Sequence, residues 1–337
     1  MFTATAVREA VAGIHDAPVA TASPVDPGNN HAYRVTFRDG RRAFLKVGTR
    51  FPDAFPAEPA TVAFLAQETT VPVPEVLTTG TEPLEYPFAV YEYVDGAEVG
   101  WVGDLPADAA RRLCREAGEH LAAVHGVSFP AFGRVGVGTE ASDGSPDPDG
   151  PDGLAVVEPR PFAESVRGSI DRQLAALRGT PFADRRDALA AAFDRLLDDV
   201  DVDAVEPALV HGDYRLDNLR VDPDADRATA AVLDWELPTA ADPLWDAVMA
   251  ETLLTTGYRT ARGTGADLRS AFRSGYGGLP NAPTRRRLYE LLGRVRLARH
   301  LDAEMRGEPT RARAERAEQH HSAFDRLLAG ESVLREG

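Results

Sequence analysis

The sequence has little cysteine, little lysine and no long apolar run. Its single cysteine, Cys114, excludes an internal disulfide and any metal site built from several cysteines, and we expect it to be a small core or surface residue. No stretch approaches the roughly 20 apolar residues that a membrane helix needs, and residues 1–10 lack the basic and apolar regions of a signal peptide. We therefore expect a cytoplasmic protein without a membrane partner.

Basic charge is scarce as well. Acidic residues number 53 against 37 lysines and arginines, which gives a formal net charge of −16 at pH 7. Such a surface offers no positive path for phosphates, so nucleic acid is not an expected partner. Among the basic residues only Lys46 is a lysine. The composition is typical of the solvated surface of a halophilic protein, and attraction of cationic substrates is the alternative interpretation.

The distribution of sequence patterns predicts two lobes. With 337 residues and 43% hydrophobic content, the chain is long enough to form two apolar cores. Residues 1–95 carry short period-2 runs that predict a small antiparallel sheet, whereas residues 96–337 carry mostly helical spacing. The predicted fold class is therefore α+β, with a small N-terminal lobe and a larger, mostly helical C-terminal lobe.

Turn residues and apolar spacing set the expected elements within these lobes. Asp39-Gly40 joins strands over 31–37 and 43–47 into a hairpin. The other expected elements are a helix over 58–67, a strand over 86–94, helices over 106–125, 162–177 and 184–197, and a helical set from 242 to the C-terminus. Residues 138–160 are rich in Gly, Pro, Asp and Ser and predict an irregular, acidic and partly disordered insertion.

Two short motifs carry the chemistry of the chain. Residues 211–218 read His-Gly-Asp-Tyr-Arg-Leu-Asp-Asn, and a short apolar run leads into Asp-Trp-Glu at 234–236. An Asp, an Asn five positions later and a second Asp at a strand end form a minimum set for ATP-dependent phosphoryl transfer. Asp213 is the expected base for an acceptor hydroxyl, and Asn218 and Asp234 are oxygen ligands of the kind that Mg²⁺ prefers. The alternatives are a solvated loop Asp, a turn Asn and a helix-capping Asp.

These motifs resemble those of the aminoglycoside phosphotransferase and choline-kinase-like superfamily. The resemblance rests on residues 211–218, on Leu-Asp-Trp-Glu at 233–236 and on Asp-Pro-Leu-Trp-Asp at 242–246, and it covers most of the chain. It implies a bilobal protein-kinase-like fold that phosphorylates small molecules with ATP and Mg²⁺. The amino-acid sequence of these motifs is similar to that of kinase-like domains joined to acyl-CoA dehydrogenases. This resemblance implies a hydroxyacyl or other hydroxylated acceptor.

Nucleotide-binding residues are expected in the N-terminal lobe. By resemblance, Lys46 would contact the α- and β-phosphates with Glu58 as its ion-pair partner, and a lone lysine among arginines independently indicates a need for a compact ammonium group. Asn30 lies in the loop expected over the phosphates, and Tyr91 and Tyr93 lie in the segment expected to pair with adenine through backbone groups. A surface lysine, a helix-start carboxylate, an ordinary turn and a plain linker are the respective alternatives.

Other charged residues near the motifs receive supporting roles. Arg215 is expected to contact the transferring phosphoryl group, because a forked cation suits its equatorial oxygens. Pairing with Asp217 or another acid is the alternative. We expect His211 to brace the loop by hydrogen bonding. Asp242 and Asp246 have the positions of a helix cap and a first-turn acid, and by resemblance they support the catalytic loop.

The sequence thus predicts a phosphotransferase that moves the γ-phosphate of ATP to a hydroxyl of a small molecule. A catalytically inactive nucleotide-binding module is the first alternative. A protein kinase is the second, and it is disfavoured because residues 234–242 are too few for an activation segment. The acceptor stays open among hydroxyacyl compounds, sugars, amino alcohols and aminoglycosides, as do the choice of ATP or GTP and the oligomeric state.

Overall fold

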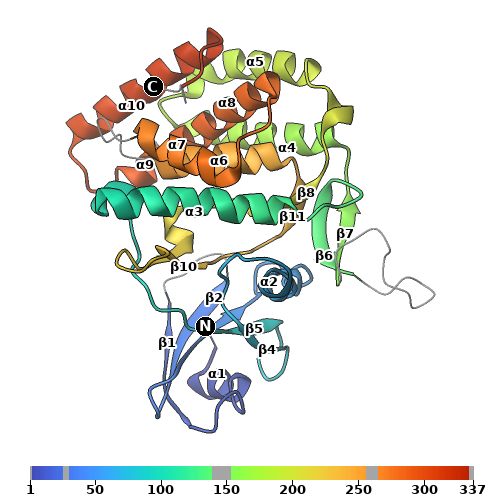
Figure 1. The fold of residues 1–337 in the computed structure, drawn as a ribbon, viewed down its shortest axis with the longest axis vertical. Coiled ribbons are helices and arrows are strands. Elements are labelled where there is room, and N and C mark those ends of the chain that lie inside the picture. The colour runs from blue at the N-terminus through green and yellow to red at the C-terminus, as the bar shows by residue number, and fades with distance from the viewer. Residues whose placement is uncertain (1, 26–29, 139–152, 256–264, 334–337) are drawn as a thin grey trace.

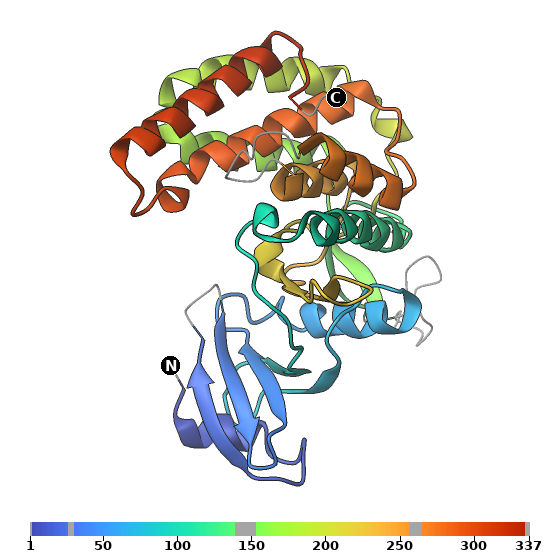
Figure 2. The same cartoon turned by 60° about the vertical axis from the view of Figure 1, so that its left-hand side comes forward.

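The structure, a computed structural model, describes residues 2–25, 30–138, 153–255 and 265–333. A small antiparallel sheet forms the N-terminal lobe and a larger, mostly helical part forms the C-terminal lobe, which confirms the predicted fold class (Figure 1). Figure 2 shows the sheet at one end of the molecule and the stacked helices at the other. The lobe boundary at residues 95 and 96 stays a prediction. No helix in the described ranges is long and apolar enough to span a membrane.

The N-terminal sheet has five strands in the order β1-β2-β3-β5-β4, with all neighbours antiparallel. The strands are β1 Val19–Pro24, β2 His31–Phe37, β3 Arg42–Val47, β4 Val76–Gly80 and β5 Phe88–Glu92. β2 and β3 form the predicted hairpin, with His31 opposite Val47. The sequence does not predict the edge strands β1 and β4, because neither shows a clean alternation of buried and exposed residues.

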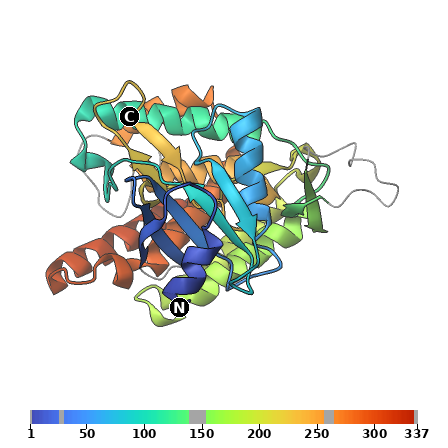
Figure 3. The ribbon, with the colours of Figure 1, turned by 90° about the horizontal axis from the view of Figure 1, so that it is seen from below.

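Alternation along β3 sends successive side chains to opposite faces of this sheet. Leu45 lies in an apolar core that includes helix α1 (Ala4–Ala10). Lys46 points to the other face, where helix α2 (Ala57–Glu68) packs. Seen from below, α1 lies in front of the strands and the helical lobe lies behind them (Figure 3). The strand pattern thus places the only lysine beside the start of α2.

Helices form the bulk of the C-terminal lobe. They are α3 Ala107–His125, α4 Phe162–Ala176, α5 Arg186–Asp198, α6 Pro243–Thr255, α7 Gly265–Tyr276, α8 Pro283–Arg299, α9 Leu301–Glu304 and α10 Thr310–Leu328. They confirm the predicted helices and the helical set after residue 242, of which 256–264 and 334–337 lie outside the described residues. Cys114 is buried in the core that α3 and α7 share, which is one of its two predicted places.

Short strands of the C-terminal lobe position the motif loops. One sheet has the order β7-β6-β11-β8, and a separate pair joins β9 to β10. The bounds are β6 Gly133–Val137, β7 Leu154–Pro159, β8 Ala208–Val210, β9 Leu219–Val221, β10 Thr229–Val232 and β11 Thr239–Ala241. The prediction that 138–160 is irregular throughout is wrong at its end, because the β-branched Val156 and Val157 lie in an edge strand that pairs with β6. Residues 139–152 of this segment lie outside the described residues.

Candidate active site

A cleft between the sheet and the helical lobe holds all the residues that the sequence predicts for the site. Its volume is about 640 Å³. The predicted residues that line it are Asn30, Lys46, Glu58, Tyr91, Tyr93, Asp213, Arg215, Asn218 and Asp234. The fold therefore gathers residues from both lobes around one space.

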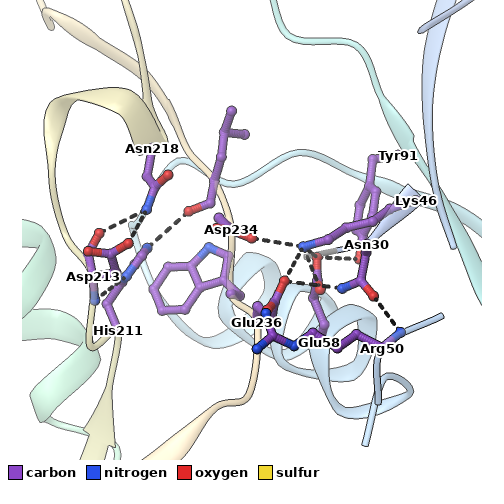
Figure 4. A network of polar contacts seen from close by, with 12 residues as sticks. Asn30, Lys46, Arg50, Glu58, Tyr91, His211, Asp213, Asn218, Asp234 and Glu236 are labelled. Atoms are coloured by element: carbon purple, nitrogen blue, oxygen red, sulfur yellow. Dashed lines mark hydrogen bonds and ion pairs between the residues drawn. The ribbon is translucent and has the colours of Figure 1, made fainter. Parts of the chain in front are cut away.

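A buried ion pair forms the sheet side of the cleft (Figure 4). Lys46 Nζ lies 2.9 Å from Glu58 Oε2, and Tyr91 OH, from β5, donates to Glu58 Oε1 at 3.3 Å. The side chains of Lys46 and Glu58 are only 11% and 6% exposed. Burial lowers the pKa of Lys46, but the carboxylates of Glu58 and Asp234 outweigh burial and raise this pKa above its ordinary value. Lys46 therefore presents a fixed positive charge to the cleft.

Asp234 follows β10 and adopts a left-handed backbone with φ 64°. Its Oδ1 accepts a hydrogen bond from Lys46 Nζ at 2.8 Å. Burial raises the pKa of Asp234, but the charge and hydrogen bond of Lys46 outweigh burial and hold the pKa below its ordinary value. Glu236 Oε2 lies 3.5 Å from Lys46 Nζ and accepts a hydrogen bond from Asn30 Nδ2 at 3.1 Å. The sequence shows Glu236 within the motif but assigns it no role.

A buried carboxylate holds the loop that follows β8. Asp246, on α6, accepts hydrogen bonds from the backbone N–H groups of His211 at 2.7 Å and Gly212 at 2.9 Å. Burial raises the pKa of Asp246, but its bond to His125 and the charge of His211 outweigh burial and lower this pKa. Gly212 has φ 75°, a conformation that glycine adopts at least cost. His211 Nε2 donates to the Leu233 carbonyl at 3.0 Å, which confirms its bracing role.

Asp213 stands in this loop beside two polar groups of the same motif. Asn218 Nδ2 donates to the Asp213 backbone carbonyl at 2.9 Å and to its Oδ2 at 3.4 Å. Arg215 Nε donates to Asp213 Oδ2 at 3.1 Å, and Arg215 Nη1 lies 2.8 Å from Asp217 Oδ2. Arg215 thus makes the acid pairing that was its alternative interpretation, while it also lines the cleft. The Asp213 and Arg215 side chains are 31% and 35% exposed, so this side of the cleft is open to water.

A second arginine reaches Asp213 from a helix far along the chain. Arg296, on α8, donates through Nη1 to the Gly212 carbonyl at 3.0 Å and through Nη2 to Asp213 Oδ1. Its side chain is 18% exposed. The sequence does not predict this contact, because nothing separates Arg296 from the other arginines of the chain before the packing of α8 is known.

Asn30 and Tyr93 lie at the ends of β2 and β5. Asn30 Oδ1 accepts a hydrogen bond from the backbone N–H of Arg50 at 3.4 Å. The rest of the loop expected over the phosphates, 26–29, lies outside the described residues. The Tyr93 ring packs under the guanidinium of Arg42 at 4.3 Å, so the segment after β5 is held by a cation–π contact.

Oxygen atoms suited to a divalent cation remain available in the cleft. The described residues contain no group of three or more His, Cys, Asp and Glu side chains able to hold a metal ion. Asn218 donates to Asp213 through its amide nitrogen, and Asp234 accepts from Lys46 through Oδ1. No residue that the structure describes forms a hydrogen bond with the amide oxygen of Asn218 or with Oδ2 of Asp234, so both atoms could bind a cation. This donor set fits Mg²⁺, which takes one or two protein oxygens and completes its shell with phosphate oxygens and water.

Comparison with known proteins identifies a family and supports the fold. The profile of the phosphotransferase enzyme family matches residues 21–291. A Ralstonia eutropha JMP134 structure named a "putative aminoglycoside phosphotransferase" is 17% identical, with coverage of 97% of each chain and a TM-score of 0.65. A thermostable mutant of aminoglycoside phosphotransferase APH(4)-Ia, in complex with AMP-PNP and hygromycin B, is 17% identical over 92% of this chain and 94% of its own, with a TM-score of 0.59. APH(2")-IIIa with GDP and kanamycin is 15% identical over 94% and 96%, also at 0.59. No curated protein sequence matches the chain.

Proposed function

The chain belongs to the phosphotransferase enzyme family, and we propose that it transfers the γ-phosphate of ATP to a hydroxyl group of a small molecule. The observation that carries this proposal is the meeting of Lys46, Asp213 and Asp234 in one cleft of about 640 Å³. APH(4)-Ia binds AMP-PNP with hygromycin B, and APH(2")-IIIa binds GDP with kanamycin. Because this chain has the same fold as these two proteins, we propose that it also binds a nucleotide and a hydroxylated acceptor.

Asp213 acts as the catalytic base in this proposal. Its carboxylate orients the acceptor hydroxyl and takes the proton as the hydroxyl oxygen bonds to the γ-phosphorus. The bond from the γ-phosphorus to the bridging oxygen breaks, and ADP leaves. Arg215, next to Asp213, stabilises the charge on the transferring phosphoryl group. Asn218 and Asp234 would hold Mg²⁺, which neutralises phosphate charge when it is bound.

The sheet side of the cleft positions the nucleotide. Lys46 contacts the α- and β-phosphates, and Glu58 fixes the ammonium group through their buried ion pair. Backbone groups of the segment from Tyr91 to Tyr93 pair with the adenine ring, and Asn30 lies near the phosphates. Both tyrosines and Asn30 line the cleft, which supports these roles.

The acidic composition of the chain indicates the location of the protein and the salt concentration that it needs. A net charge of −16 is self-repelling in dilute buffer and is screened by salt. We propose a cytoplasmic protein of a salt-rich cell that requires high ionic strength to fold. Its activity should therefore be measured in roughly 1 M potassium chloride, well above the ionic strength at which exposed charges are largely screened.

The test is ADP release with ATP and Mg²⁺ from pools of hydroxylated metabolites, repeated with Asp213→Asn. ADP release that depends on a pool and is lost in the variant supports the proposal. Release that persists in Asp213→Asn overturns the assigned base. Nucleotide binding without any phosphorylated product would indicate a binding module, and labelled protein in place of a labelled metabolite would indicate a protein kinase.

A further inference from the structure

Two cavities adjoin one another on the acceptor side of the cleft. The first, the acceptor cavity, has a volume of about 270 Å³ and is lined by Asp213, Asp234 and Glu236. The second, the arm cavity, has a volume of about 170 Å³ and shares Thr239 and Trp245 with the first as common walls. We propose, on the premise of the function above, that the acceptor is an amphipathic alcohol, whose hydroxyl lies at Asp213 and whose apolar arm fills the arm cavity.

Aromatic and aliphatic side chains form the most buried lining of the arm cavity. Phe162 of α4 and Tyr289 and Leu292 of α8 line it and are 6%, 0% and 2% exposed. The ring of Phe132, just before β6, packs edge to face on Phe162 with the ring centroids 5.4 Å apart. Burial of one methylene group against such a lining improves affinity about three- to fourfold. This lining therefore favours an apolar group.

The polar residues of the arm cavity are bonded within the protein or lie towards its surface. Asp242 is only 2% exposed, and its Oδ2 accepts from Arg285 at 2.9 Å and from the Tyr289 hydroxyl at 2.7 Å. The Thr239 hydroxyl donates to a backbone carbonyl at 3.0 Å. The others, two half-buried serines and the exposed Arg172, recur along one face of α4. The buried part of the arm cavity is thus left to apolar contacts.

Trp245 connects the arm cavity to the reacting base. It lies in the first turn of α6, directly before Asp246, whose carboxylate holds the backbone of the loop that precedes Asp213. A Cβ atom added at Gly212 would meet Cη2 of Trp245 at 3.5 Å, so the indole ring lies beside the residue that precedes the base. Because Trp245 also lines the arm cavity, an acceptor with its hydroxyl at Asp213 can extend along this ring into that cavity.

The volume of the arm cavity limits the length of the arm. A protein cavity of about 150 Å³ with an apolar lining accepts one benzene molecule. At about 170 Å³, the arm cavity therefore takes an arm of about six carbon atoms. A sugar or another polyol suits this space poorly, because each buried hydroxyl would lose its water without gaining a hydrogen-bond partner. An alkyl or aromatic arm loses nothing of this kind.

The experiment compares acceptors of equal length that differ only in the polarity of the arm. The panel pairs 1,2-propanediol, 1,2-butanediol, 1,2-pentanediol and 1,2-hexanediol with glycerol, erythritol, xylitol and sorbitol. ADP formation with ATP and Mg²⁺ gives kcat and KM, and calorimetric titration into the AMP-PNP-bound protein gives Kd. We expect KM and Kd to fall about three- to fourfold for each methylene added to the diol, and so about 30-fold or more along the series. Along the polyol series both should change less than about twofold.

Leucine substitutions on α4 test whether the arm occupies the arm cavity. Ser165→Leu and Ser169→Leu each add a branched apolar side chain at a position that lines this cavity, in a helix that tolerates leucine. Each should abolish the dependence on chain length, so that Kd for 1,2-hexanediol rises about tenfold or more towards that of 1,2-propanediol. Ala175→Leu, at an exposed position of the same helix, is the matched control and should preserve the dependence. Thermal unfolding verifies that each variant folds, and a dependence that persists in both folded serine variants overturns the inference.

The remaining outcomes distinguish this inference from the proposed function. Equal turnover of diols and polyols, lost in Asp213→Asn, would overturn the apolar arm and leave the phosphotransferase intact. Binding of diols that depends on chain length, without ADP formation from any member of the panel, would count against the proposed function and support the arm cavity. The absence of saturable binding by every diol would overturn the inference.

Discussion

On the sheet side of the cleft, Lys46 and Glu58 are 11% and 6% exposed and belong to a strand and a helix. On the loop side, Asp213 and Arg215 are 31% and 35% exposed and belong to a connection between strands. A buried ion pair is costly to break, because the remaining charge stays in the protein interior without an opposite charge or water to stabilise it. A half-exposed pair contributes little and exchanges partners readily, because water replaces what is lost. The cleft thus has a buried, fixed side formed by Lys46 and Glu58 and a partly exposed, exchangeable side formed by Asp213 and Arg215. In the proposed function the fixed side binds the nucleotide and the exchangeable side binds the acceptor.

The largest effect should follow a change on the exchangeable side. Asp213→Asn removes the proposed base while preserving its size, so turnover should fall about 10²- to 10⁴-fold. The free energy of unfolding should fall by no more than about 1 kcal/mol, because the Asp213 side chain is partly exposed and the amide oxygen of Asn can still accept from Arg296, whose side chain is 18% exposed. Steady-state kinetics and thermal unfolding measure the two quantities. Asp226→Asn, an exposed acid in the turn between β9 and β10, is the control and should leave both unchanged. Strong destabilisation by Asp213→Asn would contradict the comparison.

On the fixed side, Lys46→Met should act on stability as well as on nucleotide binding. The substitution leaves Glu58 buried without its cation, and burial raises the pKa of the Glu58 carboxyl. We expect a loss of about 3–5 kcal/mol in the free energy of unfolding. Denaturant titration measures it.

The matched control for this change lies on the same strand. Arg42 pairs with Asp95 at the surface, where their side chains are 37% and 77% exposed. Arg42→Ala should cost about 1 kcal/mol, because it removes this exposed ion pair together with the cation–π contact to Tyr93. Equal costs for Lys46→Met and Arg42→Ala would remove the distinction between a fixed and an exchangeable side.

The sequence predicts those parts of the molecule that local pattern determines. The hairpin of β2 and β3 follows from alternation and an Asp-Gly turn, and α3 follows from its helical spacing. The edge strands β1 and β7 are not predicted, because their pairing with a neighbour, rather than an apolar face of their own, defines them. Sequence motifs likewise identify residues close together in the chain.

The contact of Arg296 with Asp213 is one that sequence motifs cannot predict. Asp213 and Asn218 lie in one motif, so their spacing alone indicates that they belong together. Arg296 reaches Asp213 only because α8 packs beside the loop, and one arginine in an arginine-rich helix carries no signal of its own. The exchangeable side of the cleft is for this reason the harder one to predict.

Acid should weaken the support of the loop through a buried histidine. His120 Nε2 accepts a hydrogen bond from Arg227 Nη2 at 3.3 Å, so Nδ1 carries the proton and donates to the hydroxyl of Tyr214 at 2.9 Å. Burial, and then the charge of Arg227, lower the pKa of His120 to about 3. Below pH 6.5 the unfolded chain gains a proton that the folded protein does not, so stability falls as pH falls from about 6.5 towards about 3. At pH 5 the loss that comes from His120 should be about 2 kcal/mol.

Chemical unfolding at a series of pH values measures this dependence. His120→Gln should remove the part of this dependence that comes from His120, because the amide does not titrate there, whereas the part from His320, whose pKa burial also lowers to about 3, should persist. His15→Gln, at a half-exposed histidine of the N-terminal lobe, serves as the control and should leave the slope in place. An unchanged slope in His120→Gln would show that the loop does not depend on a neutral His120.

The smallest effect should come from the backbone of the loop itself. Gly212 and Gly13 have φ 75° and 84°, and an added Cβ would meet Trp245 at 3.5 Å in the first case and nothing within 4 Å in the second. Gly212→Ala and Gly13→Ala should therefore each cost about 1 kcal/mol of conformational strain, measured as matching shifts in thermal unfolding. Turnover should fall less than about tenfold in Gly212→Ala, since Asp246 still accepts the backbone N–H of residue 212 at 2.9 Å. A fall beyond a hundredfold would mean that the loop backbone must move during the reaction.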